Sequence, residues 1–121
     1  MSEISKNNTN LGSLLVLVIG ATGRQGGAVA RKLLEKGHHV RALIRNKESH
    51  KAKELEKLGA QLVKGDMGDI FSLQKAMKEV DAVFAMTTPY EKGINFEIKS
   101  GFLIEFAVNT TGVKHFVFSS V

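Results

Sequence analysis

Apolar residues follow two alternating periods along this chain, one typical of strands and the other typical of helices. Continuous or alternating apolar runs predict five strands, at residues 14–19, 39–44, 61–64, 80–86 and 114–119. Apolar positions spaced three and four apart predict four helices between these strands. The first begins near Arg24, and the others cover residues 46–58, 70–78 and 91–111. Glycines at 37, 59 and 112 follow the ends of three of these helices, as expected of helix C-caps.

Strict alternation of strand and helix predicts an α/β fold, a doubly wound parallel sheet of the Rossmann-like kind in three layers. The expected strand order is 3-2-1-4-5, with ligands bound at the carboxyl ends of the strands between the first and fourth. Residues 1–10 are polar and are expected to be a disordered tail, and residues 11–121 one domain. The fifth strand is expected to be an open edge of a sheet truncated after it, which favours pairing with another chain.

Three glycines between the first strand and the first helix carry the clearest chemical signal. Gly20, Gly23 and Gly26 are spaced G-x-x-G-x-x-G, which departs from the general G-x-G-x-x-G dinucleotide fingerprint. Gly20 permits a sharp turn, Gly23 permits close approach of a phosphate, and Gly26 permits tight packing of the helix on the strand. The free N–H groups at the helix start face an anion, so the stretch predicts a pyrophosphate site. The alternative is a plain turn between strand and helix.

The end of the second strand indicates which dinucleotide is bound. NAD sites usually place an acidic residue there, about 20 residues past the glycines, but this chain has Arg45 and Lys47 instead. Because an arginine binds a phosphate through a bidentate fork, the sequence predicts NADP, with NAD as the alternative. Arg24 is a second candidate for the same phosphate. The alternative for Arg45 is a solvated charge at a strand end.

Two further strand ends complete the predicted site. Asp66 and Met67 follow the third strand, where they are candidates for the adenine region, although Asp66 is equally typical of a turn in residues 65–69. Thr87, followed by Thr88, ends the fourth strand opposite the glycine loop.

The amino-acid composition argues against several classes of function, among them cysteine chemistry, metal binding and nucleic-acid binding. The chain of 121 residues has no cysteine, so it has no disulfide, thiolate metal site or cysteine nucleophile, and its four histidines show no ligand spacing. The net charge is +5, but the lysines are spread over helices without interleaved aromatic residues, which disfavours nucleic-acid binding. No apolar run approaches the roughly 20 residues that span a bilayer. A cytosolic protein is therefore expected.

Several segments resemble the NmrA-like family of atypical short-chain dehydrogenases/reductases. They are residues 20–26 (GATGRQG), 38–45 (HHVRALIR), 65–66 (GD), 87–89 (TTP) and 114–120 (KHFVFSS), and the resemblance runs from about residue 14 to the end. It implies NAD(P) binding, with Arg45 at the adenosine phosphate and Thr87 and Ser119 at the nicotinamide end. The residues that it places on the pyrophosphate side are Thr22, Arg24 and Gln25.

The resemblance also frames three functional hypotheses. Family members have a C-terminal substrate lobe beyond the position of Val121, and the Tyr-x-x-x-Lys position of those that are enzymes falls there too. Tyr90 is the only tyrosine here and has no lysine at that spacing, so no catalytic residue is identified. The first hypothesis is a redox or dinucleotide sensor that acts through a protein partner. The second is a reductase of quinones or phenolic compounds, and the third is a fragment that self-assembles through its sheet edge.

Overall fold

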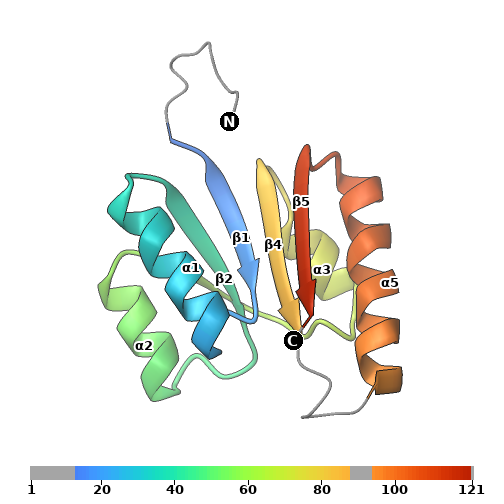
Figure 1. Cartoon of the computed structure of the whole chain (residues 1–121), viewed down its shortest axis with the longest axis horizontal. Helices are drawn as coiled ribbons and strands as arrows, with labels where there is room; N and C mark the ends of the chain where they lie inside the picture. Colours follow the sequence, from blue (N-terminus) through green and yellow to red (C-terminus); the bar gives the residue numbers. More distant parts are fainter. Residues whose placement is uncertain (1–12, 88–93, 121) are drawn as a thin grey trace.

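Strands and helices alternate through the part of the chain that the structure, a computed structural model, describes, which is residues 13–87 and 94–120. The alternation predicted from the hydrophobic pattern is confirmed (Figure 1). The elements are β1 (Leu15–Ile19), α1 (Arg24–Glu35), β2 (His39–Ile44), α2 (His50–Lys57), β3 (Gln61–Lys64), α3 (Ile70–Ala76), β4 (Ala82–Thr87), α5 (Ile94–Thr111) and β5 (His115–Ser120).

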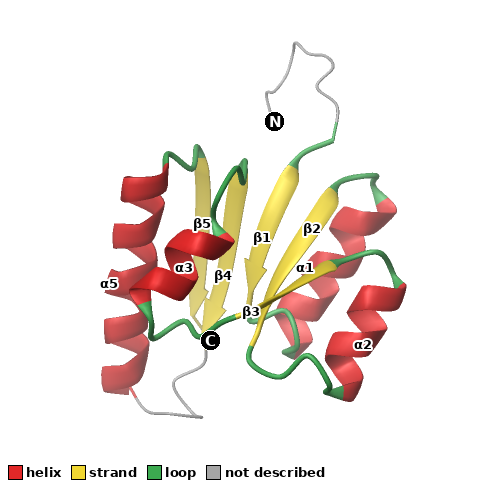
Figure 2. Cartoon of the chain, turned by 180° about the vertical axis from the view of Figure 1, so that it is seen from behind, coloured by secondary structure: helices red, strands yellow, loops and turns green. Residues whose placement is uncertain are grey.

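All five strands form one parallel sheet in the order β3-β2-β1-β4-β5. This order is the predicted one, and it makes the fold Rossmann-like. Helices α1 and α2 cover one face of the sheet, while α3 and α5 cover the other (Figure 1, Figure 2). The arrowheads point the same way, so the carboxyl ends of all strands meet at one edge, and every loop that leaves a strand begins there.

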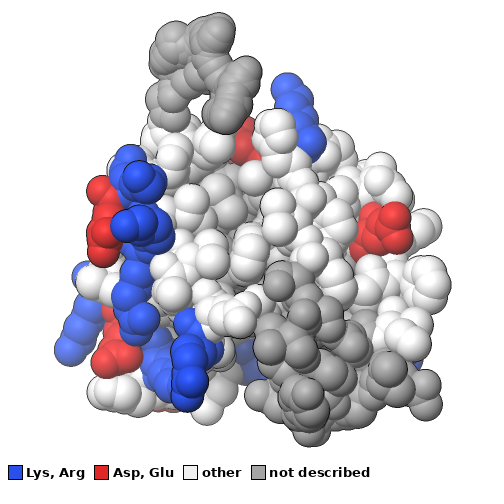
Figure 3. All heavy atoms as spheres, in the orientation of Figure 1, with Lys and Arg blue, Asp and Glu red and all other residues white. Residues whose placement is uncertain are grey.

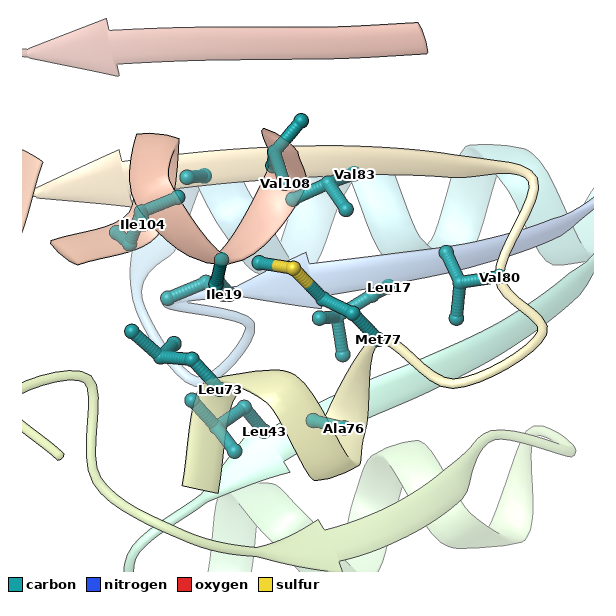
Figure 4. Packing of buried hydrophobic residues seen from close by; sticks show 12 residues of the cluster. Leu17, Ile19, Leu43, Leu73, Ala76, Met77, Val80, Val83, Ile104 and Val108 are labelled. Atoms are coloured by element: carbon teal, nitrogen blue, oxygen red, sulfur yellow. The ribbon is translucent and has the colours of Figure 1, made fainter. Parts of the chain in front are cut away.

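The core is divided by the sheet into two clusters, because successive residues of a strand face opposite ways. Val16 and Val18 of β1 pack under α1 and α2, whereas Leu17 and Ile19 pack under α3 and α5. Figure 4 shows the cluster that contains Leu17 and Ile19. Its other buried members are Leu43, Leu73, Ala76, Met77, Val80, Val83, Ala85, Ile104, Ala107 and Val108. Burial of both faces of β1 explains why its sequence is a continuous apolar run rather than an alternating one.

The second helix begins later than the sequence predicts, at His50 and not at residue 46. Asn46 Oδ1 accepts the Glu48 N–H at 3.0 Å, which forms a local turn, and Ser49 Oγ then caps the helix by accepting the Ala52 N–H at 3.2 Å. The apolar spacing also predicts that Ala52, Leu55 and Leu58 face inward. Ala52 and Leu55 are buried, but the prediction is wrong for Leu58, which is 52% exposed at the C-terminal end of α2.

The connection from α3 to β4 likewise corrects two predicted boundaries. The helix ends at Ala76, whereas the hydrophobic pattern predicts an end at Lys78. The strand begins at Ala82, whereas the pattern predicts a start at Val80. Glu79 has a φ of +63°, a left-handed conformation that neither a helix nor a strand accommodates. The apolar residues Met77 and Val80 are buried, but they belong to the turn rather than to the flanking elements.

The side chain of Arg41, in β2, links this strand to β3 and to the C-terminal end of α3. Its guanidinium donates to the carbonyl oxygens of Ala76 (2.7 Å) and Lys78 (2.8 Å) at the C-terminal end of α3, and to Gln61 Oε1 of β3 (3.0 Å). A cation placed there satisfies carbonyl groups that the helix leaves without partners. Arg41 therefore anchors α3 to β2 and β3.

Helix α5 differs from the prediction in which of its residues share a side. The apolar spacing predicts one side formed by Ile94, Ile98, Phe102 and Phe106 together with Leu103 and Ala107. In the structure Ile98, Phe102 and Phe106 are exposed, whereas Ala107 is buried. The predicted start of this helix at residue 91 lies outside the described residues. No helix in the described ranges is long and apolar enough to cross a membrane.

Candidate functional site

The glycine loop leaves β1 at the centre of the carboxyl edge of the sheet. Gly20 has a φ of +88°, which L residues with a side chain rarely adopt, and a Cβ there would lie 2.6 Å from the Met86 carbonyl oxygen. The Gly23 N–H then donates to the Gly20 carbonyl oxygen at 3.0 Å, closing a tight turn. Two independent constraints, the backbone conformation and the neighbouring strand β4, therefore require glycine at position 20.

The third glycine of the motif holds helix α1 against this turn. A Cβ on Gly26 would overlap the Gly20 carbonyl oxygen and lie 2.7 Å from its carbonyl carbon. Gly26 and Gly27 are buried, whereas Gly23 is exposed. The motif thus contains two kinds of glycine: Gly20 and Gly26 allow backbone to cross backbone, and Gly23 leaves open surface at the start of the helix.

The N-terminus of α1 is open, unlike those of the next two helices. Its N-cap residue is Gly23, no side chain of the described residues caps it, and its first turn contains no acidic residue. Ser49 caps α2, and Asp69 Oδ1 caps α3 by accepting the Phe71 N–H at 3.0 Å. The first intrahelical bond of α1 runs from the Gly27 N–H to the Gly23 carbonyl, so the N–H groups of residues 24–26 have no carbonyl partner within the helix. Such donors, at the positive end of the helix dipole, are suited to an anion.

Polar side chains surround this open helix end. Thr22 is half-buried in the turn, and Arg24 and Gln25 are exposed on the first turn of α1. The structure therefore brings together all the residues that the sequence predicts around the pyrophosphate, at one point of the sheet edge.

Arg45 and Lys47 lie at the same edge, beyond the next strand. Ile19 of β1 pairs with Leu43 of β2, so the glycine loop and Arg45 follow adjacent strand ends. Both cations are exposed, and neither forms a salt bridge with a side chain in the described ranges. An exposed guanidinium with no salt bridge among the described residues, near the open end of α1, is what the predicted role in binding a phosphate requires.

Asp66 and Met67, which follow β3, both contribute to the structure of the fold. Asp66 Oδ1 accepts the Gly68 N–H at 3.0 Å, and the Asp66 carbonyl accepts the Asp69 N–H at 3.0 Å. Asp66 is thus the turn-former that the sequence allowed, with its carboxylate exposed at the sheet edge. Met67 is half-buried and packs on the core beneath α3 rather than lying free at the surface.

The ends of β4 and β5 complete the edge. Met86 pairs with Ser119 and Thr87 with Ser120, so Thr87 and Ser119 lie on neighbouring strand ends as expected. Their side chains, like residues 88–90 with Thr88 and Tyr90, lie outside what the structure describes. Sequence reasoning missed the part played by Met86, whose carbonyl sets the space available to Gly20. Only the pairing of β1 with β4 reveals that contact.

Charge is distributed unequally between the two halves of the fold. Residues 13–64 contain eleven Lys and Arg against four Asp and Glu, whereas residues 65–121 contain five against seven. Figure 3 shows the cations gathered over α1 and α2 and extending to the end of the molecule where the strands terminate. The side of the sheet edge that carries Arg24 and Arg45 is therefore the cationic one.

A Rossmann-like sheet with an open, glycine-lined helix end at its switch point defines the class of dinucleotide-binding folds. Within that class the chain belongs to the NmrA-like family, whose model matches residues 13–121. It is 44% identical over 111 residues to the NmrA-like family domain-containing protein DDB_G0286605 of Dictyostelium discoideum, covering 88% of this chain and 35% of that protein. It is 40% identical over 111 residues to the oxidoreductase hkm9 of Aspergillus hancockii, covering 88% of this chain and 33% of that protein.

The fold of this chain is also similar to solved structures of NmrA. The negative transcriptional regulator NmrA in complex with NADP is similar with a TM-score of 0.80 and 26% identity, over 89% of this chain and 33% of that one. NmrA in complex with NAD has the same TM-score and identity, and the similarity covers 90% of this chain and 34% of that one. The chain spans about a third of the length of the curated relatives that it matches.

Proposed function

We propose that this chain is an NADP-binding domain that places the cofactor pyrophosphate over residues 20–26. The observation that carries the proposal is the uncapped N-terminus of α1, which the crossing of Gly26 over Gly20 holds at the end of β1. The other two helices whose N-terminal caps are described are closed by their own side chains, so α1 is the one left available to an anion.

The comparisons support a dinucleotide as that anion. NmrA has been solved with NADP and with NAD, and the NAD(P)H azoreductase of Xenophilus azovorans is 35% identical over 106 residues. Each of these similarities includes the glycine loop, because each covers 88% or more of this chain. NAD is therefore the natural competitor in any binding experiment.

NADP is favoured over NAD by the residues at the end of β2. The fold usually places a carboxylate there for the ribose 2′-hydroxyl of NAD, and this chain has the exposed cations Arg45 and Lys47. We assign the 2′-phosphate to Arg45, with Lys47 or Arg24 as a second cation, and the adenine region to Asp66 and Met67. The nicotinamide end is assigned to the ends of β4 and β5.

For the biological role we place sensing of the dinucleotide first, with the cytosol as the expected compartment. What supports this order is that NmrA, a structural neighbour solved in complex with NADP, is a negative transcriptional regulator. In this role the bound cofactor alters recognition of a regulatory protein. The second candidate is an NAD(P)H-dependent reductase of quinones or phenolic compounds, favoured by the oxidoreductases among the relatives.

Calorimetric titration with NADP, NADPH and NAD tests the proposal directly. Saturable binding of one cofactor per chain, tighter for NADP than for NAD, supports it, and the absence of binding of all three overturns it. Oxidation of NADPH in the presence of a quinone, followed at 340 nm, separates the two roles because a sensor binds without turnover. The turnover assay requires a chain that includes the part corresponding to the remaining length of the relatives.

A further inference from the structure

Arg31 lies in the middle of α1 and directs its guanidinium back toward the open end of that helix. A Cβ built on Gly27, one turn earlier, would lie 3.7 Å from Arg31 Nη1. Side chains of a helix lean toward its N-terminus, so a long side chain lies over the residue four positions before it. Because Gly27 has no side chain, the guanidinium of Arg31 lies close to the backbone of the first turn of α1.

The guanidinium is on the side of α1 that faces α2. Gly27, Arg31 and Leu34 are spaced four and three apart, so they form one row along the helix. A Cβ on Gly59, which follows α2, would lie 3.9 Å from Leu34 Cδ2, so this row is turned toward α2. Figures 1 and 2 show the two helices side by side on the same face of the sheet.

The same row leads to the strand end that carries Arg45. Helices α1 and α2 both begin at the carboxyl edge of the sheet, and residues 45–49 connect the end of β2 to the start of α2 there. Since β2 is the neighbour of β1, this connection lies next to the glycine loop. Arg31 therefore extends toward the part of the edge in which Arg45 and Lys47 lie.

Arg31 has no anionic partner of its own among the described residues. Glu35, one turn further along α1, is exposed, yet no salt bridge joins it to Arg31. Arg24 is in the first turn of the same helix, and that turn contains no acidic residue. Cations near the positive end of a helix dipole are unfavourable, so two guanidinium groups placed there favour the binding of an anion between them.

We propose that Arg31 is a further binding residue for the 2′-phosphate of NADP, acting together with Arg45. The inference rests on the proposed function, because it assigns a second guanidinium to the phosphate already placed beside Arg45. A phosphate monoester carries nearly two negative charges and several acceptor oxygens, enough for the forks of two arginines. Arg31 approaches this phosphate from α1 and Arg45 approaches it from β2.

This arrangement makes Arg31 a residue that determines cofactor specificity. NAD offers only a hydroxyl group where NADP carries the 2′-phosphate, so it leaves the two guanidinium groups without an anion between them. Their repulsion then acts against NAD while their attraction favours NADP, and specificity depends on both effects. The glycine loop has no such effect, because it is proposed to bind the pyrophosphate that the two cofactors share.

Calorimetric titration of Arg31→Met with NADP and with NAD tests the assignment. Methionine retains much of the apolar stem and removes the charge. The variant is expected to bind NADP about fivefold more weakly and NAD within about twofold of wild type, as for the loss of an exposed ion pair. Lys32→Met is the control, since it removes the same charge from the next, exposed residue of α1, outside the row that faces α2. It is expected to change neither affinity by more than about twofold.

Fragments of the cofactor make the test independent of the nicotinamide end. Adenosine 2′,5′-bisphosphate and AMP differ only in the 2′-phosphate, so Arg31→Met is expected to reduce the ratio of their affinities by the same factor as for NADP and NAD. In the double variant Arg31→Met/Arg45→Ala, NADP affinity is expected to fall by less than the product of the two single losses, because both residues bind one phosphate. Circular dichroism establishes that each variant is folded.

The outcomes separate this inference from the proposed function. If wild type binds NADP and Arg31→Met leaves its affinity unchanged, the role of Arg31 is overturned while the cofactor site stands. Equal weakening of NADP and NAD also overturns it, because Arg31 would then act on the shared pyrophosphate or on the fold. A wild-type chain that binds none of the four compounds overturns the proposed function and the role of Arg31 with it.

Discussion

Gly26 packs against the Gly20 carbonyl so closely that a single methyl group at position 26 has no room. The contact is between two backbones, so it cannot be relieved by rotation of a side chain. It fixes the distance between the first turn of α1 and the end of β1, and with it the position of the N–H groups proposed to bind the cofactor.

Gly26→Ala is therefore expected to destabilise the protein, although alanine normally stabilises a helix relative to glycine by about 1 kcal/mol. Overlap with backbone forces α1 away from β1, and a loss of about 2–3 kcal/mol in the free energy of unfolding is expected from comparable overpacking. Urea denaturation followed by circular dichroism measures it. Gly23→Ala is the control, since its Cβ would lie 3.3 Å from the Gly20 oxygen and needs only a slight adjustment. Equal stability of the Gly26 and Gly23 variants would contradict the crossing.

Gly23→Val tests the pyrophosphate site without testing the fold. Gly23 is exposed and has a φ of −79°, which valine adopts readily, so the sheet is expected to form. The branched side chain lies at the open helix end, where a phosphate must approach the backbone. Binding of NADP is expected to fall by at least a hundredfold in calorimetric titration, with the thermal midpoint changed by only a few degrees. Unchanged affinity in the folded variant would remove the glycine loop from the site.

Arg41→Met tests the link between α3 and the sheet. The substitution leaves the carbonyls of Ala76 and Lys78 without their charged donor while retaining most of the apolar stem. Hydrogen bonds to charged groups contribute about 1.5–3 kcal/mol, and because Arg41 is only partly buried a loss near the lower figure is expected. Arg31→Met, on the exposed side of α1, is the control and is expected to change stability by less than about 0.5 kcal/mol. If the two variants unfold at the same urea concentration, the three hydrogen bonds of Arg41 contribute nothing net.

The succession of strands and helices and the glycine loop were predictable because both depend on local patterns, and the strand order then followed from the general rules of doubly wound sheets. A continuous apolar run specifies a strand buried on both faces, as in β1, and glycines that follow periodic segments specify helix ends. Gly37, Gly59 and Gly112 all have the positive φ expected at such ends. The spacing of apolar residues and the conformational freedom of glycine are properties of short segments, so both can be recognised in the sequence without knowledge of the rest of the fold.

The errors occurred where a polar side chain or tertiary packing decided the outcome. The start of α2 depends on whether Asn46 or Ser49 captures a backbone N–H, and both are good caps. The outward orientation of Phe102 could not be read from spacing, because α5 has apolar residues on two sides and the pattern does not say which one faces the sheet. The contact of Gly20 with Met86 depends on residues 66 positions apart.

Arg45→Ala tests the choice between the two dinucleotides. If Arg45 binds the 2′-phosphate, its loss removes a charge-assisted hydrogen bond that contributes about 1.5–3 kcal/mol. NADP affinity is then expected to fall by about tenfold or more, while NAD affinity is almost unchanged. Arg45→Lys keeps the charge without the fork and is expected to fall between wild type and alanine.

A control for net charge makes that result specific. Lys57→Ala removes the same unit of charge at the C-terminal end of α2, away from the carboxyl edge of the sheet, so it reports long-range attraction of an anionic cofactor alone. NADP binding by this variant is expected to remain within about twofold of wild type at physiological salt, where screening acts over about 8 Å. Should NAD affinity fall as much as NADP affinity in Arg45→Ala, Arg45 does not contact the 2′-phosphate. The preference would then have to come from Lys47 or Arg24, which the corresponding alanine variants identify.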